Sequence, residues 1–189
     1  MTAALSDWPP AGGWTTDDLD DLPDDNVRRE LLDGVLLVSP SPSSVHQILA
    51  MRLGVALEQS CPEEYEVTQG VEVRISPRRS FIPDVLVVTD EAAQQVARHF
   101  APHEVVLAVE IVSPTSQSMD RITKPALYAR AGIPYYWRIE TDGGITVHTS
   151  KIDPAQNVYE PVETFKNAIE TSEPWRIEIP ISALTPRHL

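Results

Sequence analysis

Two carboxylates stand where an ionised side chain is costly to bury. Glu110 is the only polar residue in the run VVLAVEIV, and Asp84 lies in FIPDVLVV with apolar neighbours on both sides. Strands this apolar are usually covered on both faces. Burying an ionised carboxylate costs several kcal/mol unless a cation or hydrogen bonds compensate for the lost hydration. Both residues are therefore candidates for a site that holds a cation.

The chemistry of that site follows from its oxygen donors. Without histidine or cysteine nearby, two carboxylates favour a hard divalent cation, Mg²⁺ or Mn²⁺. Asp84 and Glu110 can project into one site if their strands are neighbours in a sheet. Without a cation the carboxylates repel, so we expect one pKa to be raised and Asp84→Asn to relieve the repulsion. The alternative is a structural pair of buried acids neutralised by arginines, for instance Arg74 or Arg130.

The elements that must position these acids alternate between strands and helices. Apolar runs and turn residues predict strands at 34–38, 66–75, 81–88, 105–112, 135–140 and 145–149, with strand-like pieces near 158 and at 176–179. Helices are predicted to begin at Thr15 or Thr16, to cover 44–59 and 90–100, and to end at Ala131. The predicted fold class is α/β with mixed elements, a central mixed β-sheet flanked by helices. Residues 1–14 are interpreted as a flexible leader and 15–189 as a single domain.

Composition limits the partners and the compartment. Lys and Arg total 15 against 28 Asp and Glu, so the formal net charge is -13, which disfavours adhesion to nucleic acid or anionic membrane. Cys61 is the only cysteine, which excludes an intramolecular disulfide and indicates a reducing compartment. The run 105–112 is too short to span a bilayer, and the N-terminus lacks the pattern of a secretory signal. We therefore expect a cytoplasmic protein.

Pro83-Asp84, followed by Glu110-x-Val112 on the next buried strand, resembles the PD-(D/E)xK nuclease superfamily with its last motif position altered. More closely, the chain resembles the bacterial "putative restriction endonuclease" domain family. The matching pieces span roughly residues 16–149: ELLDG at 30–34, SP at 39–40, His46, PD at 83–84, VEIVSPTS at 109–116, Asp120, Lys124, Tyr128, ARAGIP at 129–134 and YW at 136–137. Their order and spacing together are specific, and they imply a restriction-endonuclease-like fold.

The resemblance also implies a lysine that has migrated. Positions i and i+2 of a strand share a face, so the motif lysine would occupy the position of Val112, which carries no charge. Lys124 matches the family's lysine in the following helix, where it would orient the attacking water or stabilise charge at phosphorus. Pro125 follows it directly, so the helix either begins near Thr123 or is kinked. The alternative for Lys124 is a solvated helix lysine.

Further site residues are implied around this core. Glu30 matches a glutamate that precedes the family's first strand and reaches the metal or pairs with the lysine; otherwise it is an exposed acid at a helix end. Ser44 and His46 lie at the start of a predicted helix, where backbone N–H groups favour a phosphate. A lone histidine is also compatible with a purely structural role. Arg121 is one of the few basic residues near the site.

The function expected is metal-dependent phosphodiester hydrolysis by a DNA endonuclease. Asp84 and Glu110 would bind Mg²⁺ or Mn²⁺, with the carbonyl of Ile111 as a further ligand, and Glu30 and Lys124 would complete the catalytic set. DNA as the partner rests on the resemblance and is disfavoured by the net charge; a homodimer would supply two sites for the two strands. The alternatives are a catalytically inactive nuclease-fold binding or assembly module, and a hydrolase of small phosphodiesters or nucleotides.

Overall fold

The structure is a computed structural model that describes residues 9–23, 25 and 27–187, so the first part of the expected leader lies outside the described residues. The first helix, α1 (Thr16–Asp20), is capped as its sequence predicts. The Thr15 hydroxyl accepts the Asp18 N–H, and the Asp18 carboxylate accepts the Thr15 N–H in return. No helix within the described residues is long and apolar enough to cross a membrane.

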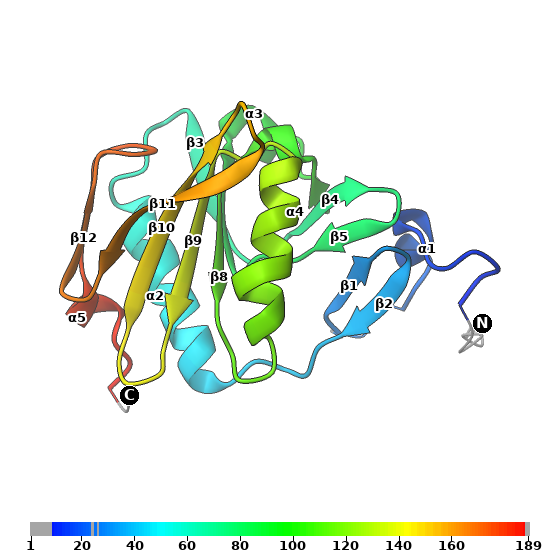
Figure 1. Ribbon diagram of the computed structural model, residues 1–189, viewed down its shortest axis with the longest axis horizontal. Helices are drawn as coiled ribbons and strands as arrows, with labels where there is room; N and C mark the ends of the chain where they lie inside the picture. The colour runs from blue at the N-terminus through cyan, green and yellow to red at the C-terminus, as the bar shows by residue number, and fades with distance from the viewer. Residues whose placement is uncertain (1–8, 24, 26, 188–189) are drawn as a thin grey trace.

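A six-stranded mixed sheet forms the centre of the molecule (Figure 1). Its strands, in spatial order, are β11 (Val158–Phe165), β10 (Thr146–Asp153), β9 (Tyr135–Glu140), β8 (Val105–Ile111), β6 (Val85–Thr89) and β3 (Tyr65–Thr68). β8 pairs parallel with β9, and the other pairs are antiparallel. The predicted mixed sheet flanked by helices is therefore confirmed, including the neighbouring positions of the two strands beside Asp84 and Glu110.

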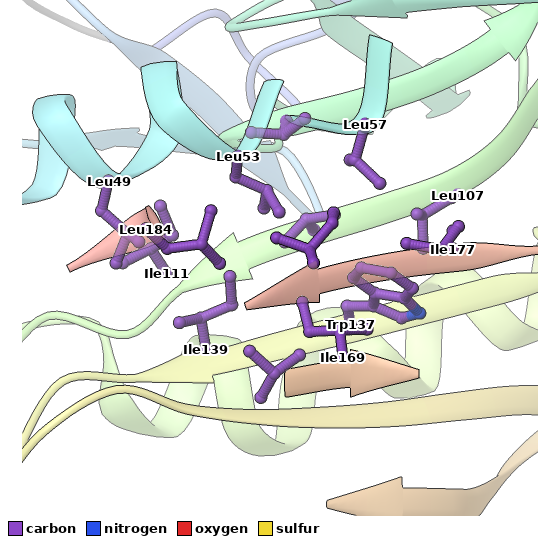
Figure 2. Packing of buried hydrophobic residues seen from close by; sticks show 14 of the residues in the cluster. Leu49, Leu53, Leu57, Leu107, Ile111, Trp137, Ile139, Ile169, Ile177 and Leu184 are labelled. Carbon is purple, nitrogen blue, oxygen red and sulfur yellow. The ribbon is translucent and has the colours of Figure 1, made fainter. Parts of the chain in front are cut away.

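Helices cover both faces of this sheet. Figure 1 shows α4 (Lys124–Arg130) across one face, whereas α2 (Ser44–Glu58) lies on the other. Figure 2 shows the side of α2, where its leucines pack against β8, β9, the hairpin β12 (Ala168–Thr171)–β13 (Ile177–Pro180) and α5 (Ile181–Leu184). The residues labelled there are Leu49, Leu53, Leu57, Leu107, Ile111, Trp137, Ile139, Ile169, Ile177 and Leu184. The central strands β6 and β8 are therefore buried on both faces.

A second sheet, which the sequence did not predict, lies beside the α4 face. Its order is β2 (Val35–Val38), β1 (Arg29–Leu32), β5 (Arg79–Phe81), β4 (Glu72–Ser76) and β7 (His99–Phe100). Glu30 therefore lies buried on the first strand itself, which rules out the alternative of an exposed acid at a helix end. The Asp33-Gly34 turn, with φ of 52° and 83°, closes the β1–β2 hairpin and is a sequence signal for it.

Three predicted element boundaries are wrong for local reasons. The strand expected at 66–75 is two strands, β3 and β4, because Gly70 has φ of 65° and sends the chain into the second sheet. The strand expected at 81–88 is divided at Pro83, with β5 in one sheet and β6 in the other. The helix expected at 90–100 ends early as α3 (Asp90–Ala93), because Phe100 is buried beside β4 in the strand β7.

Candidate active site

Asp84 and Glu110 lie next to each other on adjacent strands. β6 and β8 pair antiparallel with Val85 opposite Val109, so the next position sets Asp84 opposite Glu110. The Asp84 N–H donates to the Val109 carbonyl at 3.0 Å. Because side chains alternate along a strand, both acids point to the face that carries Leu86 and that α4 covers. The predicted placement of the two carboxylates in one site is thus supported by the register of the sheet.

Asp84 is a well-compensated carboxylate. Its Oδ1 accepts from Arg28 Nη1 at 3.0 Å, and its Oδ2 accepts from the Ile111 N–H at 2.8 Å and from His46 Nε2 at 3.1 Å. Burial opposes ionisation, but the His46 hydrogen bond and the Arg28 charge outweigh it and lower the pKa of Asp84. Asp84 is therefore anionic in the folded protein at neutral pH.

For Glu110, burial outweighs the contacts that favour the ionised carboxylate. It is 1% exposed, and its Oε1 accepts from both Lys124 Nζ at 3.0 Å and the Tyr128 hydroxyl at 2.8 Å. Burial raises the pKa of Glu110 to about 8; Lys124 lowers it, and the nearby acids Asp84 and Asp120 raise it further. The sequence-based expectation of one raised carboxyl pKa is therefore met by Glu110, and burial is its main cause.

Lys124 is buried in this cluster instead of being solvated. It is the first residue of α4, and Pro125 occupies the first turn, where its missing N–H costs no hydrogen bond. A π-helical turn, η2 (Met119–Thr123), precedes it. The ammonium contacts Glu30 Oε1 at 2.9 Å and Glu110 Oε1 at 3.0 Å, and the side chain is 4% exposed. Burial lowers the pKa of Lys124, but Glu110 and Glu30 more than reverse that effect.

Two further acids complete the cluster around Lys124. Glu30 Oε1 also accepts the Ile82 N–H at 2.8 Å, which fixes β1 to the segment before Asp84. Asp120 lies 3.7 Å from Lys124 Nζ and accepts a hydrogen bond from the Ser116 hydroxyl. Burial raises the pKa of Asp120. Four buried acids therefore share one buried ammonium and the half-buried Arg28.

The cluster opens onto a cavity of about 490 Å³. Its lining includes Arg28, Glu30, His46, Asp84, Glu110, Ile111, Asp120 and Lys124, together with the loops 39–43 and 113–116. A cavity of this size lies in the usual range for small-ligand sites. The residues that the sequence analysis assigned to catalysis and metal binding are all in this lining.

Two residues expected to bind substrate are placed elsewhere. Ser44 does not line the cavity; its neighbour Ser43 does, and the Ser43 hydroxyl caps α2 by accepting the His46 N–H. Arg121 also lies outside the lining, and its guanidinium binds Glu140 with two hydrogen bonds of 2.8 and 2.9 Å. His46 does line the cavity, but through its contact with Asp84. These placements correct the expectation for Ser44 and Arg121.

The arginine beside Asp84 is one that sequence reasoning missed. Arg28 pairs with Asp84, whereas Arg74, a candidate for that role, binds Asp20 and Glu72 on the second sheet. Arg28 precedes β1, a strand that the sequence analysis did not predict, so Arg28 was not among the candidate site residues. The Asp33-Gly34 hairpin signal would have put residues 28–32 on a strand.

A divalent cation fits the donor set by charge and by ligand type. If all four acids were ionised, they would carry four negative charges against the two positive charges of Arg28 and Lys124, whereas in the metal-free protein the raised pKa of Glu110 lets it keep a proton up to about pH 8. A bound dication would favour the ionised form of Glu110. Carboxylate and carbonyl oxygens are the ligands that Mg²⁺ prefers. The hydrogen bonds that Glu110 accepts from Lys124 and Tyr128 both use Oε1. Asp84, Glu110 and the carbonyl of Ile111 could hold the ion, although no three His, Cys, Asp or Glu side chains in the described part of the chain are already placed as a metal cluster.

Comparisons with known proteins identify the family and the fold of the chain. The family model described as "Uma2: Putative restriction endonuclease" matches residues 16–181. Among solved structures, the chain is similar to "a putative nuclease belonging to DUF820" from Anabaena variabilis, with a TM-score of 0.70 and 18% identity over 90% of this chain and 96% of that chain. At this identity the likeness shows the fold alone. A comparison with curated proteins found no match.

Proposed function

Because this chain belongs to the Uma2 family of restriction-endonuclease-like proteins, we propose that it is a divalent-cation-dependent phosphodiester hydrolase that cleaves DNA. The observation that carries the proposal is the gathering of four buried acids at one open cavity. Glu30, Asp84, Glu110 and Asp120 are each at most 7% exposed, and Arg28 and Lys124 are the Arg and Lys side chains that pair with them among the residues that the structure describes. Burying these carboxylates together costs folding free energy, because they lose hydration and repel one another, and a bound dication would offset that cost.

The chain's own residues would act around that cation as follows. Asp84, Glu110 and the carbonyl of Ile111 would hold Mg²⁺ or Mn²⁺, which would supply Lewis acidity at the scissile phosphate. Tyr128 and Lys124 fix Glu110 through Oε1 and thereby orient its carboxylate. The Lys124 ammonium would orient the attacking water or neutralise charge that develops at phosphorus. Glu30 holds Lys124 in that position.

The direct test is cleavage of supercoiled plasmid with Mg²⁺, Mn²⁺ or EDTA. The proposal expects nicked or linear product with either metal and none with EDTA or with Glu110→Gln. Arg176→Gln is the surface control, because Arg176 directly precedes β13, its side chain is 84% exposed and it pairs with Glu178 away from the cavity. A wild-type protein that is inert with both metals on plasmid and on single-stranded DNA contradicts the proposal. Sedimentation of the active sample would show whether it is the proposed homodimer.

A second candidate function is hydrolysis of a small phosphodiester or nucleotide, which the surface charges favour. Several arginines outside the cavity are paired with acids and are less free to bind a duplex backbone: Arg29 with Asp25, Arg74 with Asp20, Arg79 with Asp33, Arg121 with Glu140 and Arg176 with Glu178. Phosphate contacts supply much of the affinity for DNA. Turnover of bis(p-nitrophenyl) phosphate without DNA cleavage would favour this function.

The third candidate is a nuclease fold without catalysis, acting as a binding or assembly module. Val112 stands at the motif lysine position, and the cavity acids are already paired with Arg28 and Lys124. DNA binding that is unchanged by EDTA, without cleavage of any phosphodiester, would favour this candidate.

A further inference from the structure

Arg28 is the one guanidinium that lines the cavity, within the part of the chain that the structure describes. Its Nη1 donates to Asp84 Oδ1 at 3.0 Å, and its Nη2 donates to the Ile82 carbonyl and lies 3.8 Å from Glu30 Oε1. The side chain is 25% exposed, far more than the 4% of Lys124. Arg28 therefore occupies the mouth of the acidic cluster, and Lys124 its interior.

We infer that Arg28 is the counter-ion of Asp84 in the metal-free protein. When a divalent cation binds the Asp84 carboxylate, Arg28 becomes the phosphate-binding residue of the site. This inference rests on the proposed function, because it needs a cation at Asp84. It adds a substrate contact that neither the family resemblance nor the proposed catalytic set contains.

The contacts of Asp84 explain why the arginine would move. Both carboxylate oxygens are engaged, Oδ2 by His46 and the Ile111 N–H and Oδ1 by Arg28. A cation bound at about 2.0–2.6 Å from Oδ1 would lie close to the guanidinium, and two positive groups repel at that distance. Of the Asp84 contacts, the Arg28 side chain is the most exposed and the easiest to displace.

The released guanidinium suits a phosphate better than any other group in the lining. A guanidinium binds two phosphate oxygens with parallel hydrogen bonds, and Arg28 already presents both terminal nitrogens to two acceptors. Lys124 is held by Glu30 and Glu110, and His46 is engaged with Asp84. The Arg28 carbonyl accepts the Ser39 N–H at 3.2 Å beside the β1–β2 hairpin, so the change of partner would be made by the side chain while the backbone stays in place.

The experiment follows the reactivity of Arg28 toward phenylglyoxal by peptide mass spectrometry in the wild-type protein. We expect low labelling without metal, higher labelling with Mg²⁺, and lower labelling again when a phosphorothioate oligothymidylate is added with Mg²⁺. Arg29 is the internal control, because it pairs with Asp25 and does not line the cavity, so its labelling should stay constant.

Binding of Mn²⁺, measured by electron paramagnetic resonance, supplies the second readout. Arg28→Gln should bind Mn²⁺ about tenfold more tightly, because the ion no longer competes with a charge-assisted contact. The same variant should lose affinity for the oligonucleotide by about tenfold, whereas Arg29→Gln should match the wild type in both. The inference is overturned, and the proposed function stands, if the wild type binds Mn²⁺ but two other results are negative. These are that Mg²⁺ does not change the labelling of Arg28 and that Arg28→Gln leaves the affinity for Mn²⁺ unchanged. Absence of Mn²⁺ binding by the wild type would overturn the proposed function itself.

Discussion

Lys124 Nζ lies 3.0 Å from Glu110 Oε1, although the two residues come from different elements, α4 and β8. The contact puts an ammonium beside the strand acid while Val112, two residues after that acid, stays out of the cavity lining. The π-helical turn before Lys124 and the first-turn position of Pro125 set its direction. A helix thus supplies the cation that the strand itself lacks.

Lys124→Met is expected to reduce DNA cleavage by roughly 10²–10³-fold, because it removes one positioned group that stabilises charge in the transition state. Lys151→Met is the matched control, since Lys151 is exposed and pairs with Glu173. The measurement is the initial rate of plasmid nicking at saturating Mg²⁺. Cleavage by Lys124→Met at the wild-type rate would mean that Lys124 has only a structural role.

The two central acids should respond differently to neutralisation in the metal-free protein. Glu110→Gln should leave the free energy of unfolding equal or higher, because the group removed is one whose ionisation burial opposes. Asp84→Asn should lower it by about 1–3 kcal/mol, because Arg28 and the Ile111 N–H lose a charged acceptor. This reverses the sequence-based expectation that Asp84→Asn relieves repulsion.

Urea unfolding in EDTA measures both variants against the wild type. Both variants should lose metal-dependent cleavage. Asp84→Asn should also lose stability, whereas Glu110→Gln should lose activity without losing stability. Equal destabilisation by the two substitutions would show that Glu110 is as well compensated as Asp84.

The raised pKa of Glu110 gives the metal-free protein a defined pH dependence. In the folded state the carboxyl keeps its proton up to about pH 8, whereas in the unfolded chain it ionises near 4.5. Between these values the folded state binds more protons, so stability falls as pH rises, by at most about 1.4 kcal/mol per pH unit. Asp84, whose pKa is lowered, loses its stabilising effect only under more acidic conditions.

The measurement is the difference in unfolding free energy between wild type and Glu110→Gln at pH 5.5, 6.5 and 7.5 in EDTA. The wild type should become progressively less stable relative to the variant as pH rises. A difference that stays constant over this range would show that Glu110 is ionised throughout.

Tyr128 should act on Glu110 through its hydroxyl group. Tyr128→Phe removes the 2.8 Å hydrogen bond to Glu110 Oε1 and leaves the edge-on packing against Phe81. Tyr159→Phe is its control, because that hydroxyl donates to the Ile133 carbonyl away from the site. Both changes should cost about 1 kcal/mol of stability, the usual net value of such a bond. In plasmid cleavage only Tyr128→Phe should lower the rate, and equal rates for the two variants would remove Tyr128 from the site.

The acids of the site could be found from sequence because burial makes them anomalous. Glu110 and Asp84 interrupt apolar strands, and a charge in such a place requires compensation. The partners that compensate them could be found only in part. Lys124 and Glu30 entered through the family resemblance, since nothing in their own surroundings distinguishes them from surface charges.

Arg28 and the second sheet could not be predicted by the same means. The acidic stretch before Arg28 favours a helix N-terminus, and only the Asp33-Gly34 turn indicates the β1–β2 hairpin. Pairing between β1 and β5 joins residues about fifty positions apart, at Leu31 and Ser80, which local patterns do not encode. Long-range pairing thus decides which arginine reaches Asp84.

The central claim is that Asp84 and Glu110 share a divalent cation, and a Mn²⁺ soak of crystals tests it most directly through anomalous scattering. The account predicts one peak at about 2.0–2.6 Å from a carboxylate oxygen of each residue, with Arg28 withdrawn from Asp84. The contradicting result is a map with no peak in the cavity at saturating Mn²⁺, in which Arg28 and Lys124 still bind Asp84 and Glu110.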